Sequence, residues 1–136
     1  MRILSIDYGE RRTGLAVTDE LGITAQGLNT IIAHSEKEVL KQVVGIVKEY
    51  GVGKILLGLP LNMDGSESEK SRKVRAFGET LTGETSLPVI YWDERMTTMQ
   101  AKRVMAELET KTFGNKHIVD RISATLMLQE YMKTLP

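Results

Sequence analysis

Short runs of apolar residues, many of them β-branched, predict five strands in this chain. Two of these runs lie close together at the start, and the later two are the most continuous. Continuous apolar runs bounded by turn residues are typical of strands that are buried on both faces. The predicted strands are 2–7, 14–18, a segment within 24–33, 54–59 and 88–92.

Apolar residues at helical spacing predict four helices, the first of which begins after the third strand. Ser35 and Glu38 have the spacing of a capping box there, and Gly51 can end that helix. Further helices are expected near 67–82, 97–108 and 117–134. Three strands followed by alternating helices and strands predict an α/β domain. Its sheet should begin with an antiparallel meander and continue through parallel crossover units.

Length and composition favour one domain that spans residues 1–136. Cysteine is absent, and the apolar run at the N-terminus is too short for the core of a signal peptide, so a cytoplasmic location is expected. No apolar stretch approaches the length of a membrane span. Because 18 Lys and Arg balance 18 Asp and Glu, any affinity for nucleic acid must come from a local basic face.

Acidic residues follow or interrupt three of the apolar segments. Asp7 ends the first predicted strand, Asp93 and Glu94 follow the fifth, and Asp120 lies in the apolar C-terminal helix. A buried carboxylate is costly unless it is paired, and Mg²⁺ or Mn²⁺ prefers oxygen ligands. The pattern therefore indicates a metal-dependent phosphodiesterase. Taken singly, each acid also suits a turn, a helix cap or a helix dipole, and Asp93 competes with Glu94 as the ligand.

Several polar residues near these acids are candidates to bind phosphate. Arg95 offers a planar fork, and Asn62 and Ser66 lie in a loop at the end of the fourth strand, although turn formation also explains them. A phosphate-facing rim, or merely a solvated face, is expected from Arg11, Arg12, Lys70, Arg72, Lys73, Arg75, Lys102, Arg103, Lys111 and Lys116. His34 and His117 have no partner spacing that would indicate zinc. An aromatic content of 5% disfavours a base-stacking platform.

Four segments in this order resemble the YqgF/RuvX family of small RNase H-like proteins, which are similar to Holliday junction resolvases. The segments are Asp7 to Val17, Gly58 to Ser66, Asp93 to Thr98, and Asp120 to Gln129. The resemblance covers nearly the whole chain. It implies an RNase H-like fold with a mixed five-stranded sheet flanked by helices. Glu10 and Thr125 depart from residues that are common in the family.

The resemblance also implies a function. The family is regarded as nucleases for the 5′ end of precursor 16S ribosomal RNA, and has been proposed to resolve DNA junctions. Its acidic triad corresponds to Asp7, Glu94 and Asp120, which would hold two Mg²⁺ or Mn²⁺ ions for in-line displacement at phosphorus. Arg95 and Arg11 or Arg12 would hold flanking phosphates. A four-way junction with two-fold symmetry would favour a homodimer.

Three other readings of the sequence remain open. The turn after Asp7 resembles the phosphate-binding turn of actin-like ATPases, although these need two such domains. A non-catalytic RNA-binding factor in ribosome maturation would keep the fold without turnover. A phospho-acceptor domain is disfavoured because the opening hairpin breaks βα alternation. Nothing in the sequence distinguishes precursor rRNA from branched DNA as the partner.

Overall fold

The computed structural model describes residues 1–96, 99, 103–104, 106–107 and 116–136. Most of the helix expected near 97–108 falls outside these residues. Lys102 and Lys111 also fall outside them. The elements of the described residues follow the predicted order. They are β1 (Arg2–Asp7), β2 (Arg12–Thr18), β3 (Ala25–Ile32), α1 (Glu36–Tyr50), β4 (Val52–Leu59), α2 (Glu69–Thr85), β5 (Val89–Asp93), the 3-10 turn η1 (Glu94–Met96) and α4 (Lys116–Met132).

The five strands form one mixed sheet in the order β3-β2-β1-β4-β5. β2 runs antiparallel to both β1 and β3, whereas β4 runs parallel to β1 and to β5. The predicted antiparallel start and parallel continuation are therefore confirmed. Because β1, β4 and β5 point the same way, their carboxyl ends lie at one edge of the sheet, where α/β proteins commonly bind ligands.

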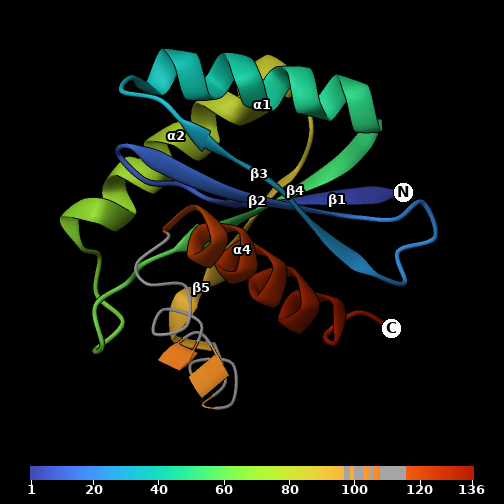
Figure 1. Cartoon of the computed structure of the whole chain (residues 1–136). Helices are drawn as coiled ribbons and strands as arrows, with labels where there is room; N and C mark the ends of the chain where they lie inside the picture. The colour runs from blue at the N-terminus through green and yellow to red at the C-terminus, as the bar shows by residue number, and fades with distance from the viewer. Residues whose placement is uncertain (97–98, 100–102, 105, 108–115) are drawn as a thin grey trace.

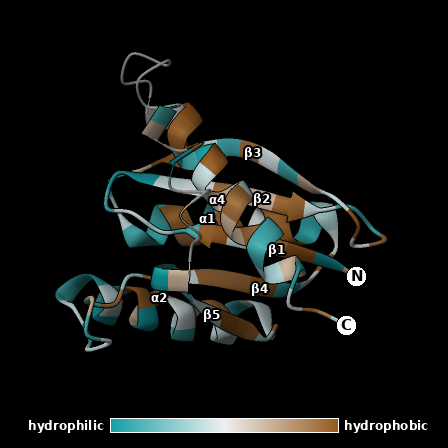
Figure 2. Cartoon of the chain, turned by 90° about the horizontal axis from the view of Figure 1, so that it is seen from below, coloured by the Kyte–Doolittle hydropathy of each residue, from teal (hydrophilic) through white to brown (hydrophobic). Residues whose placement is uncertain are grey.

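Helices cover both faces of the sheet, with α1 and α2 on one side and α4 on the other (Figure 1). The α1/α2 side buries Val43, Phe77 and Leu81 against Leu4 and Ile6 of β1. The α4 side buries Ala124 and Leu128 against a separate set of sheet residues. Each fully buried side chain of this size stabilises the fold by about 1.5–3 kcal/mol. In Figure 2 the interior strand β4 is coloured hydrophobic along most of its length, whereas the edge strand β3 is mixed.

Local capping explains where two of the helices begin. The Ser35 hydroxyl accepts a hydrogen bond from the Glu38 backbone N–H at 3.2 Å, and Gly51 ends α1 at φ 63°, as expected from the sequence. Ser68 opens α2 through a reciprocal capping box with Ser71. This second box was not predicted, and α2 begins two residues later than expected, because serine replaces the usual Glu or Gln at the third helical position.

No helix in the described part of the chain combines the length and the apolar character needed to cross a bilayer.

Candidate nuclease site

Two of the predicted acids stand at the edge where the parallel strands end. Asp7 is the last residue of β1, and Glu94 directly follows β5. β4 lies between these strands. A Cβ at Gly58 of β4 would lie 3.0 Å from Glu94 Oε1 and 2.9 Å from Met127 Sδ. The glycine therefore leaves the space over β4 through which Glu94 reaches Asp7.

The Asp7 and Glu94 carboxyl groups share a hydrogen bond. Burial, followed by the charge of Asp7, raises the pKa of Glu94 to about 7. Burial also raises the pKa of Asp7, while the positive charge of Lys70 lowers it. The interaction between the two carboxyl groups raises the pKa of Glu94 and lowers that of Asp7, and their crowding favours a single proton on the pair. Two crowded carboxyl groups cannot both ionise cheaply.

Asp120 approaches this pair from α4. A Cβ at Gly14 would overlap the Asp120 carbonyl oxygen and lie 3.3 Å from the Asp120 Cβ, so the glycine allows α4 to pack closely on β2. The charge of Asp120 contributes to the raised pKa of Asp7. However, Asp120 Oδ2 lies 2.8 Å from Arg12 Nε, and both side chains are partly buried. Arg12 therefore neutralises the third acid of the predicted set.

Asp7, Glu94 and Asp120 are not grouped as a ready-made metal site. Among the residues that the structure describes, no three His, Cys, Asp or Glu side chains are grouped closely enough to bind one. The donor chemistry nevertheless fits a hard divalent cation, since Asp7 and Glu94 present crowded oxygen ligands that a cation would relieve. Asp120 lies near Asp7 and Glu94, but its ion pair with Arg12 would have to break before it could bind the cation. Metal binding by the three acids stays a prediction.

The structure separates the roles of the adjacent acids Asp93 and Glu94. Arg95 Nη2 lies 2.7 Å from Asp93 Oδ2, and the Arg95 backbone N–H also donates to Asp93 at 2.9 Å. The Arg95 hydrogen bond holds the pKa of Asp93 below its usual range. Arg95 Nη1 additionally donates to the Met63 carbonyl at 3.2 Å. Asp93 is thus occupied by Arg95, and Glu94 is the acid that faces Asp7.

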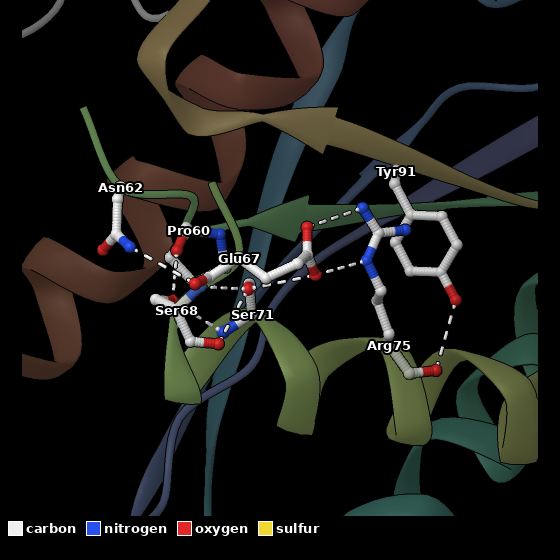
Figure 3. A network of polar contacts seen from close by, with 7 residues as sticks. All are labelled: Pro60, Asn62, Glu67, Ser68, Ser71, Arg75 and Tyr91. Carbon is white, nitrogen blue, oxygen red and sulfur yellow. Dashed lines mark hydrogen bonds and ion pairs between the residues drawn. The ribbon is translucent and has the colours of Figure 1, made fainter. Parts of the chain in front are cut away.

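Asn62 and Ser66 stabilise the loop between β4 and α2. Asn62 Nδ2 donates to Ser66 Oγ at 3.0 Å and to the Glu67 carbonyl at 3.2 Å. The Ser66 hydroxyl donates to Asp64 at 2.6 Å. Figure 3 shows Asn62 reaching across to the backbone that leads into α2. These bonds agree with the turn-forming alternative, and substrate binding by Asn62 and Ser66 stays a prediction.

Part of the expected basic rim is neutralised by local partners. Arg75 Nε lies 2.6 Å from Glu67 Oε1, and its guanidinium also stacks over Tyr91 (Figure 3). Lys73 Nζ lies 3.3 Å from Glu10 and 3.8 Å from Glu69. These pairs reduce the charge that the start of α2 offers to phosphate. Lys102, Lys111 and the side chain of Lys116 lie outside the described residues.

Two residues of the site, Ser123 and Lys70, were not predicted as part of it. The Ser123 side chain lowers the pKa of Asp7, and the charge of Lys70 acts on both Asp7 and Glu94. Ser123 stands three residues after Asp120, so helical spacing alone could have placed it on the same face of α4. Lys70 was expected only as one member of the basic rim, because nothing local in the sequence relates α2 to the end of β1.

A family model described as "RuvX: Holliday junction resolvase" matches residues 1–134. The chain belongs to this family. A protein of Halothermothrix orenii named "Putative pre-16S rRNA nuclease" is 40% identical over 132 residues, which cover 97% of this chain and 94% of that protein. A Clostridium novyi protein of the same name is 44% identical over 135 residues and covers 99% and 100% of the two chains. The resemblance deduced from the sequence motifs is confirmed.

Solved structures confirm the RNase H-like fold of this RuvX family member. The Thermus thermophilus RuvC structure in complex with a Holliday junction substrate aligns with a TM-score of 0.60 at 16% identity, covering 98% of this chain and 97% of that chain. The fowlpox virus Holliday junction resolvase aligns with a TM-score of 0.59 at 15% identity, covering 99% and 100%. At such identities these structures establish the shared fold alone.

Proposed function

We propose that this RuvX family member is a metal-dependent nuclease that hydrolyses phosphodiester bonds at the 5′ end of precursor 16S ribosomal RNA. The observation that carries the proposal is the interaction between Asp7 and Glu94, which are far apart in the sequence and meet at one sheet edge. The names of the relatives, which match nearly the whole chain, support the RNA substrate.

The acids have distinct parts in this proposal. Asp7, Glu94 and Asp120 would hold Mg²⁺ or Mn²⁺, and such a cation stabilises charge on phosphate oxygens and lowers the pKa of a bound water. The pair must lose its shared proton to solvent before both Asp7 and Glu94 can act as carboxylate ligands. Ser123 would favour the ionised form of Asp7, since it lowers the pKa of Asp7. Arg12 holds Asp120 in place until Asp120 turns toward the other two acids.

Cleavage by the purified protein tests the proposal. Precursor rRNA with a 5′ extension and four-way junction DNA should be incubated side by side with Mg²⁺ or Mn²⁺ and with EDTA. We expect metal-dependent trimming of the RNA. Asp7→Asn should abolish it while the far-UV circular dichroism spectrum is kept, and Glu49→Gln, an exposed change on α1, should cleave normally. Full activity of Asp7→Asn would refute the proposal, and RNA binding without turnover would favour the non-catalytic factor.

Cleavage of branched DNA is the second candidate function, because the matching family model is described as a Holliday junction resolvase. A two-fold symmetric junction requires two active sites, so this function would need a homodimer. Preferential cutting of the junction over the RNA, together with a dimer in sedimentation analysis, would establish it in place of RNA processing.

A further inference from the structure

A cavity of about 570 Å³ lies against the turn that follows Asp7. It lies between the β1–β2 turn, residues 8–12, and the first two turns of α2. Gly9 makes this turn possible, because a Cβ there would overlap the Arg12 carbonyl oxygen. Cavities of 300–1,000 Å³ accommodate small ligands, so this one has room for a nucleotide-sized unit.

The walls of the cavity carry more positive than negative charge. Arg11, Arg12, Lys70 and Lys73 line it, against two glutamates. Lys73 is paired with both of those glutamates, and Arg12 is paired with Asp120. Within the described residues, neither Arg11 nor Lys70 makes an ion pair or a side-chain hydrogen bond. The charged groups of Arg11 and Lys70 are therefore available to a ligand, and both side chains are long enough to move.

Two residues of the cavity wall connect it to the acid pair Asp7 and Glu94. Tyr8, in its wall, directly follows Asp7, and the charge of Lys70 acts on both Asp7 and Glu94. Among the described residues of the wall, Tyr8 is the one aromatic side chain, and one face of its ring is covered because it stacks on Phe77 at a centroid distance of 4.1 Å. The wall thus offers charge for a phosphate more readily than a surface on which a base could stack.

We propose that this cavity is a subsite for a backbone phosphate adjacent to the one that is cleaved, with Arg11 and Lys70 as its two ligands. The inference rests on the proposed nuclease function and adds the position at which the strand is held. Lys and Arg side chains that neutralise phosphates position a nucleic acid without reading its sequence. The subsite therefore orients the strand and does not select its bases.

RNA binding in EDTA tests the subsite without cleavage. A short fluorescein-labelled single-stranded RNA should be titrated by fluorescence anisotropy at several salt concentrations. Arg11→Gln and Lys70→Gln should each weaken binding about tenfold, as for one hydrogen bond to a charged group. Each should also reduce the slope of log affinity against log salt by about 0.7. Lys48→Gln, which removes an exposed charge at the far end of α1, should leave both quantities unchanged.

The outcomes separate the subsite from the nuclease function. Wild-type affinity and slope in both Arg11→Gln and Lys70→Gln would overturn the subsite, even if the protein cleaves RNA normally. Failure of the wild-type protein to cleave, with binding that still depends on both residues, would overturn the nuclease function alone. Adenosine monophosphate and inorganic phosphate should compete only weakly with the RNA. Competition by either as tight as by the RNA, and dependent on Arg11, would show a free-ligand site instead.

Discussion

Replacing Glu94 with glutamine should stabilise the metal-free protein at neutral and alkaline pH. The Glu94 pKa is about 7 in the folded chain, against 4.5 for an ordinary glutamate, because of burial and of the neighbouring Asp7. The folded state therefore retains a proton that the unfolded state has already lost. Stability must fall as the pH rises from 4.5 through 7, and below 4.5 the effect disappears since both states are protonated.

The size of this effect follows from the two pKa values. The difference between 4.5 and about 7 corresponds to about 3 kcal/mol in the free energy of unfolding. Glu94 is only partly buried, so solvent screening should bring the measured change to about 1–3 kcal/mol. Glutamine removes the ionisation and can still donate a hydrogen bond to Asp7. Glu94→Gln should thus exceed the wild type by this amount above pH 7 and match it near pH 4.

Urea unfolding in EDTA, followed by circular dichroism across this pH range, measures the difference between the two proteins. Asp93→Asn is a matched control, because the Arg95 hydrogen bond lowers the pKa of Asp93. The ionised Asp93 contributes its full stabilisation at pH values above its ordinary pKa of 3.8. Asp93 should therefore add no pH dependence to stability between pH 5 and 8. A wild-type curve that is flat over this range would refute the reasoning. An equally steep curve for Glu94→Gln would refute it too.

Three further changes test other parts of the structure. Gly58→Ala should abolish cleavage, because the new methyl group meets Met127 and displaces Glu94. It should lower the free energy of unfolding by about 1–3 kcal/mol in urea. Normal cleavage would contradict the proposed path of Glu94 over β4. Ser68→Ala should cost about 1 kcal/mol by loss of the helix cap, and no loss would contradict the capping box. Phe77→Ala should cost about 3–5 kcal/mol in thermal or urea unfolding, and a loss below 1 kcal/mol would show that the side chain is not fully buried.

Most of the fold was predictable because it depends on local spacing. The runs at 2–7, 54–59 and 88–92 became β1, β4 and β5, and the apolar periodicity after Ser35 became α1. Strand and helix periods are properties of the backbone and need no knowledge of distant partners. The antiparallel start followed from the short first turn. By the same logic Asp7 was correctly expected at the carboxyl end of its strand.

The partners of each site residue were much less predictable. Asp93 and Glu94 are neighbours in the chain, yet one is held by Arg95 and the other meets Asp7. Arg12 was expected to face phosphate, and in the structure it pairs with Asp120. These outcomes depend on which strands are neighbours in the sheet. They depend as well on how closely α4 packs against the sheet. Local spacing in the sequence encodes neither the strand order nor this packing distance.

The chain's periodic apolar pattern thus specifies its elements, and its motifs specify its family. The route of Glu94 across β4 instead depends on a missing side chain at Gly58, and the approach of Asp120 depends on another at Gly14. Both glycines act on residues far away in the chain. Their effect arises only when close packing brings these segments together, because steric exclusion and charge act through space rather than along the sequence.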